Sequence, residues 1–149
     1  MLKKLFAPGD DSFLTDVALL VLRVWLGLSM LINHGLGKLQ GFKTMAAEFP
    51  DPFGVGHSTS LALVVFAEFF ASILLAIGLV TRFAALVLVV NMTVAFFLVH
   101  KGALSGPQSG ELAFIYLAGY VGLLLAGAGR ISVDRYLFQG GSKRTASAK

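Results

Sequence analysis

Four apolar stretches, each long enough to cross a lipid bilayer as a helix, dominate this 149-residue sequence. They run over residues 13–36, 61–80, 83–99 and 112–128. About 20 apolar residues, rising 1.5 Å each, cover the ~30 Å hydrocarbon core of a bilayer. Because lipid offers the backbone no hydrogen bonds, only helices and closed barrels span it. The pattern therefore predicts an all-α integral membrane protein, a four-helix bundle.

The composition supports this class and limits the chemistry. Hydrophobic residues make up 56% of the chain and charged residues only 13%, whereas soluble domains carry about 25% charged residues. The chain has no cysteine, which excludes disulfides, thiolate-bound metals and thiol redox chemistry. Any electrons must therefore pass through a bound cofactor or a partner protein. The net charge of +4 arises from residues at the ends of the apolar stretches, so it does not indicate nucleic-acid binding.

The connecting segments define one membrane domain over residues 13–136. Phe42, Met45 and Phe49 recur at helical spacing within 41–49, which is typical of a short helix lying in the membrane interface. We expect residues 1–12 to form a cytoplasmic N-terminal segment. The small, polar and basic residues at the end of the chain predict a disordered tail over 137–149.

Lysine and arginine positions predict the orientation. Four spans place both termini on one side, and that side holds eight of the 12 basic residues, whereas the other side holds three. Cytoplasmic loops carry the excess of Lys and Arg. We therefore expect cytoplasmic termini in a multi-pass protein of the cell inner membrane, in contact with membrane lipid.

Two charged residues fall near the middle of the predicted membrane. Arg23 lies within the first stretch and Glu68 within the second, at depths that nearly coincide in antiparallel helices. Charges in hydrocarbon are costly and need partners. We therefore predict an Arg23–Glu68 pair, with Asn91 at the same level and able to bond to either. Such a pair would either fix the helix register or serve function.

A second polar group collects at the outer ends of the stretches. His34 and Lys38 follow Arg23 on one helix face, because eleven residues are almost three full turns and leave only about 20° between Arg23 and His34. His100 ends the third stretch and Glu111 begins the fourth. At 100° per residue, His100 and Asn91 lie on opposite faces of their helix. That arrangement argues against a single compact site.

Tyr116 and Tyr120 lie four residues apart on one face of the fourth stretch. They could line a pocket for a ring-shaped ligand or serve as ordinary packing. The three histidines lack the spacing of a zinc site, so no metal site is expected.

Several short patterns, in order, resemble the DoxX family of small membrane proteins. They are Arg23-Val-Trp-Leu-Gly27, His34-Gly35-Leu-Gly-Lys38-Leu39, Gly78-Leu79-Val80-Thr81-Arg82 and Gly127-Ala128-Gly129-Arg130-Ile131-Ser132-Val133-Asp134. The positions that match the family are Arg23, His34, Lys38, Glu68, Arg82, His100, Glu111, Ser132 and Asp134.

The resemblance implies a four-helix bundle described as an oxidoreductase subunit. It implies links to quinone-coupled thiosulfate oxidation, or to membrane complexes with a superoxide dismutase and a sulfurtransferase in oxidative-stress defence.

These observations lead to a first functional hypothesis, a redox subunit that binds a quinone or similar carrier and is not a complete enzyme alone. His34 and Glu68 are its expected catalytic residues, since quinone reduction consumes protons. The expected ligand-binding residues are Arg23, Lys38, Asn91, His100, Glu111, Tyr116 and Tyr120. The alternatives are a small oligomeric proton or solute transporter, for which buried ionisable residues are typical, and a membrane scaffold for soluble redox partners.

Overall fold

A computed structural model describes residues 12–139 of the chain, and these residues form helices and loops with no β-strand among them. Three long helices each contain a π-helical segment, marked η. The first comprises α2 (Ser12–Met30), η1 (Leu31–Gly35) and α3 (Leu36–Gln40). The second comprises α5 (His57–Val65), η2 (Phe66–Ala71) and α6 (Ser72–Ile77). The third comprises α7 (Thr81–Thr93) and η3 (Val94–Val99), and α8 (Glu111–Ala126) forms the fourth helix.

Two short helices lie outside these four. The helix expected over residues 41–49 is present only as one turn, α4 (Phe42–Met45). Helix α9 (Val133–Gln139) continues past residue 137, so the prediction that the disordered tail starts there is wrong. The remaining residues predicted as terminal segments, 1–11 and 140–149, lie outside the described residues.

Three of the helices are long and apolar enough to cross a membrane. They are Ser12–Gln40, His57–Ile77 and Thr81–Val99. Helix α8 is equally apolar but has 16 residues, which gives it a length of about 24 Å at 1.5 Å per residue. Their outward faces are rich in large apolar side chains, such as those of Trp25 and Leu125. An apolar outer surface around a helical bundle is what a lipid environment requires.

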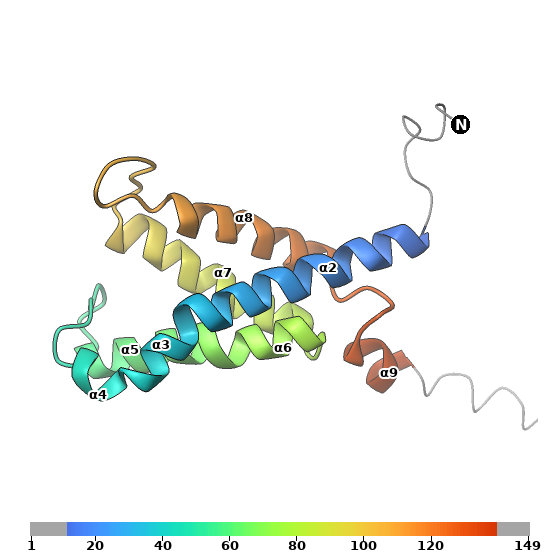
Figure 1. The fold of residues 1–149 in the computed structure, drawn as a ribbon, viewed down its shortest axis with the longest axis horizontal. Helices are drawn as coiled ribbons and strands as arrows, with labels where there is room; N and C mark the ends of the chain where they lie inside the picture. Colours follow the sequence, from blue (N-terminus) through green and yellow to red (C-terminus); the bar gives the residue numbers. More distant parts are fainter. Residues whose placement is uncertain (1–11, 140–149) are drawn as a thin grey trace, which may run out of the picture.

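The helices pack as two antiparallel pairs, α2 with α6 and α7 with α8. The pairs meet where α7 contacts α6 and η2, and where α8 contacts α2. Figure 1 shows the resulting elongated bundle, with the loops of residues 46–56 and 100–110 at one end, which we call the loop end. The start of α2, the helix α9 and the tight turn between α6 and α7 lie at the other end, which we call the terminal end.

The core between the pairs is apolar. Its fully buried side chains include Leu75, Leu88, Tyr120 and Leu123. The α2–α6 pair approaches closely at Gly27, where an added Cβ would lie 2.8 Å from the carbonyl oxygen of Ser72. Small residues at such crossings let membrane helices pack backbone to backbone.

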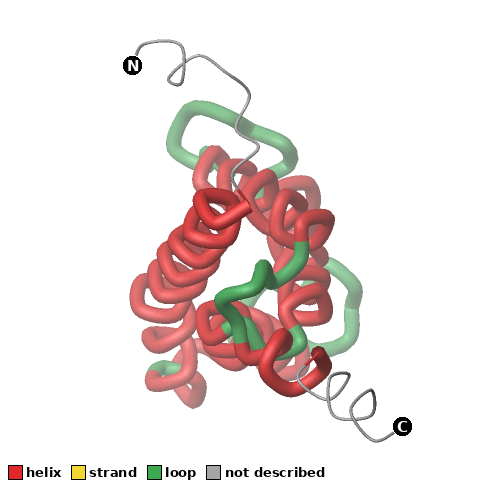
Figure 2. The backbone as a smooth tube through the Cα atoms, turned by 90° about the vertical axis from the view of Figure 1, so that its right-hand side faces the viewer, coloured by secondary structure: helices red, strands yellow, loops and turns green. Residues whose placement is uncertain are grey.

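The loop of residues 127–132 crosses the terminal end, as Figure 2 shows in the view onto that end. Hydrogen bonds from this loop and from α9 stabilise the helix ends there. The Asp134 carboxylate accepts hydrogen bonds from the backbone N–H groups of Val80 (2.6 Å) and Thr81 (2.9 Å), where α7 begins. Asp16 of α2 accepts bonds from the backbone N–H (2.7 Å) and Nε (2.6 Å) of Arg130. The loop and the start of α9 thereby connect the start of the first helix to the start of the third.

Candidate functional site

A cavity of about 820 Å³ opens at the loop end, among η1, η2, the α7–η3 helix and the start of α8. Its lining is mostly apolar, with a small group of polar side chains. Six residues singled out in the sequence lie on its wall: His34, Lys38, Glu68, Asn91, His100 and Tyr116. An apolar cavity with a few converging polar groups is the usual form of a small-molecule site.

The polar group centres on the Glu68 carboxylate. Lys38 Nζ lies 2.5 Å from Glu68 Oε2, and Asn91 Nδ2 donates to Glu68 Oε1 at 3.3 Å. The exposed fractions of the Lys38 and Glu68 side chains are 21% and 7%. A carboxylate withdrawn from water requires a partner of opposite charge and further hydrogen bonds, and here it has both.

Helix geometry brings Lys38 to Glu68. Side chains on a helix lean toward its N-terminus, so Lys38 reaches back along the first helix, toward the level of Gly35. Gly35 itself packs on η2, since a Cβ there would lie 2.4 Å from the Glu68 carbonyl oxygen. The missing side chain at Gly35 therefore allows η1 and η2 to touch and puts the lysine within reach of the carboxylate.

The predicted Arg23–Glu68 pair is wrong. Arg23 is fully buried near the terminal end, and its Nη2 donates to the carbonyl oxygen of Ile131 at 2.6 Å. Arg23 precedes Gly35, the residue level with Glu68, by twelve positions, which corresponds to about 18 Å along a helix. Its side chain also leans toward the helix N-terminus, away from Glu68. Of the two partners considered for Asn91, the structure shows Glu68.

His34 and Tyr116 form the aromatic side of the cavity. Their rings meet edge to face with centroids 6.0 Å apart. The Tyr116 hydroxyl lies 2.6 Å from Ser29 Oγ, which fixes the ring position. His34 shares the cavity wall with Glu68 and Lys38. Sequence reasoning missed Ser29, because a serine in a membrane helix has no distinguishing pattern.

His100 and Asn91 line the same cavity, so the prediction that they face different sites is wrong. The six residues of η3 lie between them. A π segment closes with i→i+5 bonds and holds an extra residue in its turn, which rotates the residues after it by about 100° relative to an α-helix. His100 Nδ1 contacts the carbonyl oxygen of Gln108 at 3.1 Å, within the loop to α8.

The π segments coincide with the site. His34 lies in η1 and Glu68 in η2, and η3 ends at the residue before His100. Such segments are frequent at functional sites, since they re-aim side chains within a helix.

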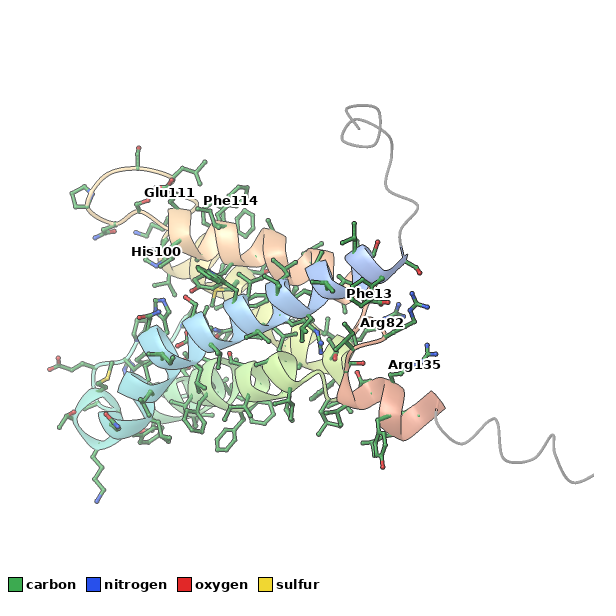
Figure 3. The ribbon with its side chains drawn as sticks, turned by 45° about the vertical axis from the view of Figure 1, so that its right-hand side comes forward. Phe13, Arg82, His100, Glu111, Phe114 and Arg135 are labelled. Atoms are coloured by element: carbon green, nitrogen blue, oxygen red, sulfur yellow. The ribbon has the colours of Figure 1, made fainter. Side chains whose placement is uncertain are left out.

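Three predicted ligand-binding residues do not line the cavity. Arg23 lies at the terminal end. Tyr120 is fully buried in the core, stacked beneath Tyr116 with ring centroids 5.7 Å apart. Glu111 is exposed at the start of α8, and Figure 3 shows it beside His100 on the loop-end surface.

The loop before α5 covers the loop end of the cavity, a role that sequence reasoning missed. Phe49, Pro50, Pro52 and Phe53 belong to the cavity wall. Asp51 organises this loop by accepting hydrogen bonds from Ser60 Oγ (2.7 Å) and the backbone N–H of Gly56 (2.7 Å). These bonds, of which the one from Ser60 has the largest effect, hold the pKa of Asp51 below its ordinary value of 3.8.

Within residues 12–139, no three His, Asp or Glu side chains gather as metal ligands.

Comparison with known proteins assigns the family. A model of the DoxX family matches residues 18–101. The chain belongs to the DoxX family. The match covers all the site residues of the three long helices, from His34 to His100.

Two DoxX relatives come from Haemophilus influenzae, and both are described as uncharacterized proteins. One is 34% identical over 119 residues, covering 74% of this chain and 84% of the relative. The other is 31% identical over 126 residues, covering 80% and 83%. No solved structure matches the chain significantly. The protein is therefore a DoxX-family membrane protein, and the descriptions of these two relatives state no activity.

Eight of the nine DoxX positions separate into two sets in space, and the ninth, Glu111, is exposed at the start of α8. His34, Lys38, Glu68 and His100 surround the cavity. Arg23, Arg82, Ser132 and Asp134 lie at the terminal end, where each bonds to backbone of a loop or helix end. Figure 3 shows the labelled Arg82 at the end opposite to His100. The second set holds the bundle together, so we restrict the candidate site to the first set and its neighbours.

Proposed function

We propose that this protein is a non-autonomous subunit of a membrane redox system, and that its cavity holds the ring of a quinone or similar lipid-soluble carrier. The observation that supports the proposal most strongly is the Lys38–Glu68–Asn91 group facing a mainly apolar cavity of about 820 Å³. Cavities that bind small molecules typically enclose about 300–1,000 Å³. A flat ring with two polar oxygens requires such a combination of apolar wall and few polar anchors.

The polar side chains match the chemistry of a quinone. Quinone oxygens accept hydrogen bonds, and the Lys38 ammonium, the Asn91 amide and the Tyr116 hydroxyl can donate them. Reduction to the quinol takes two electrons and two protons. Glu68 and His34 are the groups that exchange these protons, since carboxylates and imidazoles are the usual proton carriers near neutral pH.

The electrons come from a partner redox protein, in either the membrane or the water phase. The chain has no cysteine to carry them, so the cavity supplies binding, orientation and protons to a carrier that a partner reduces or oxidises. Oligomerisation with further copies of the chain is compatible with this role.

We also propose that α8 is a fourth span and that the terminal end faces the cytoplasm of a bacterial inner membrane. The proposal rests on the excess of Lys and Arg at that end. It is supported by the antiparallel packing of α8 along α7. Single cysteines at Ser105 and Arg135 test it in intact cells, because only the former should react with a membrane-impermeant thiol reagent.

The transport alternative has no specific observation in its favour. It would require the helix face shared by Arg23, His34 and Lys38 to line a polar route through the bundle. The buried side chains of Met30, Ala71 and Leu75 instead belong to the apolar core between the helix pairs.

Equilibrium titration with a short-chain benzoquinone tests the redox proposal. The protein is held in lipid nanodiscs, and wild type is compared with Glu68→Gln and His34→Ala. Ile32→Ala is the matched control, since Ile32 lies two residues before His34, is exposed on the outer face and does not belong to the cavity wall. We expect saturable binding to wild type and control, with weaker binding to both site variants. Equal binding by all four proteins would refute the proposed site.

A further inference from the structure

One wall of the cavity is incomplete, where the second and third helices separate. These helices are joined by the tight turn at the terminal end, and α7 packs on α6 and η2. Beyond η2 they separate, since α5 has no comparable contact with α7 or η3. Figure 1 shows α5 and α7 diverging toward the loop end, with the first helix crossing between them and the viewer.

The side chains at this separation belong both to the cavity wall and to the outer surface. Leu63 and Phe66 on the second helix line the cavity and are 60% and 44% exposed. Leu86 and Val90, one turn apart on the third helix, line it too and are 47% and 55% exposed. A side chain that borders a cavity while remaining exposed marks its rim. The four residues therefore surround an opening in the side of the bundle, which we call the lateral opening.

The other sides of the cavity are closed by close packing. Met30 and Glu68 are nearly fully buried on the side where η1 meets η2. On the α8 side, an added Cβ at Gly110 would lie 2.7 Å from His100 Cβ and 2.9 Å from Phe96 Cδ2. Exposed wall residues also occur at the loop end, at Phe53, Val99 and Leu112, but there η3 and α8 stay in contact, whereas α5 has no comparable contact with α7 or η3.

The lateral opening is apolar throughout, and it lies along helices of membrane-spanning length and composition. It thus faces the hydrocarbon of the bilayer. The Lys38–Glu68 pair lies inside, on the side of the cavity where the first helix meets η2. The cavity therefore presents a polar inner wall and an apolar exit to lipid.

We infer that the ligand of this cavity is an amphiphile that enters sideways from the bilayer between the second and third helices. Its polar head contacts the Lys38–Glu68 pair, and its apolar chain leaves through the lateral opening and stays in lipid. The inference rests on the proposed function only for the nature of the head group. It excludes small water-soluble metabolites as the main ligands, because these would have to enter beneath the loop of residues 49–53.

The absence of cysteine allows a direct test in liposomes with Ala67→Cys. Ala67 lines the cavity and is almost fully buried, so a reagent must enter the cavity to reach it. An alkyl maleimide that partitions into lipid is compared with a charged, water-soluble maleimide. For each reagent, the rate of modification of Ala67→Cys is divided by the rate at an accessible reference cysteine. The reference is Trp25→Cys on the outer face of α2 for the alkyl maleimide and Ser105→Cys in the exposed loop for the charged maleimide.

We expect the lipid-soluble reagent to modify Ala67→Cys at least about tenfold faster after normalisation, since thiol modification follows access. Adding Val90→Trp at the lateral opening should slow this reaction. Phe83→Trp is the matched control on the same helix, exposed but outside the cavity wall, and should leave the rate unchanged. If Val90→Trp does not fold, Leu63→Trp tests the opposite rim.

Faster reaction with the charged reagent would overturn the inference, as would slowing by Pro52→Trp at the loop end in place of Val90→Trp. A long-chain isoprenoid quinone, added to the same liposomes, tests the head group separately. Protection of Ala67→Cys supports both proposals. If the alkyl maleimide reaches Ala67→Cys through the lateral opening but the quinone does not protect the cysteine, the result supports sideways entry and refutes a quinone as the ligand.

Discussion

The Gly35–Glu68 contact makes the most specific prediction about stability. A Cβ at Gly35 would lie 2.4 Å from the Glu68 carbonyl oxygen, 2.6 Å from its carbonyl carbon and 2.8 Å from the Phe69 nitrogen. All three are backbone atoms, so no side-chain rotation relieves the overlap. Ordinary van der Waals contact begins at 3.4 Å. In Gly35→Ala, η1 must therefore withdraw from η2 by about 1 Å.

Overpacking of this kind costs about 1–3 kcal/mol of unfolding free energy. For a chain of this size, that cost lowers the unfolding midpoint by about 2–12 °C. The same displacement moves Lys38 away from Glu68, so binding of a ligand in the cavity should weaken as well. Circular dichroism during thermal unfolding in nanodiscs measures the first effect, and quinone titration measures the second.

Gly37→Ala is the matched control, two residues further along the same helix. A Cβ there meets no atom within 4 Å, and replacing a helical glycine by alanine should stabilise by about 0.5–1 kcal/mol. The two alanine variants should therefore shift the midpoint in opposite directions. A midpoint for Gly35→Ala at or above that of Gly37→Ala would refute the close η1–η2 contact.

Three further predictions concern the two ends of the bundle. Gly78→Ala should lower the unfolding free energy by about 1–3 kcal/mol, because φ is +75° there. Its Cβ would also overlap Arg23 Nη1, so part of the cost should disappear in an Arg23→Ala background, and strictly additive costs in a double-mutant cycle would contradict this packing. Asp134→Ala removes the carboxylate that caps α7 and should cost about 0.5–2 kcal/mol by thermal unfolding; an unchanged midpoint would show that the cap is not formed. Asp51 has a lowered pKa in the folded loop, so its stabilisation is present above pH 3.8 and lost as the pH falls below that value; protection of the backbone amides of residues 49–57 from hydrogen exchange, corrected for the pH dependence of intrinsic exchange, should fall in that range in wild type and be low at all pH values in Asp51→Asn.

The helical architecture could be predicted from the sequence because apolar length alone determines it. Each predicted span coincides with a helix, and the boundaries differ by a few residues. The second helix begins at His57 instead of Leu61, since the sequence between them is polar but still helical. Interface residues of this kind have no apolar pattern that would mark them as part of a span.

The candidate site could be predicted as a set of residue types but not as a set of contacts. His34, Glu68, Asn91 and His100 were identified because polar groups in apolar helices are costly. Their partners depend on relative helix depth and on three π segments, which leave no recognisable sequence pattern. The sequence placed Arg23 and Glu68 at nearly the same depth in the membrane, which gave the wrong partner for Arg23. It also treated the third helix as a regular α-helix, so the rotation introduced by η3 was missed and His100 was assigned to the wrong face.

The measurement that tests the central claim most directly is mass spectrometry of small molecules extracted from the protein purified in mild detergent. Wild type, Glu68→Gln, His34→Ala and the Ile32→Ala control are extracted in parallel. We predict a quinone or similar lipid-soluble carrier in wild type and control, with reduced amounts in the two cavity variants. A carrier present in equal amounts in all four proteins would contradict the proposed site, and an amphiphile of another class, lost only from the cavity variants, would contradict the quinone while keeping the cavity as its binding place.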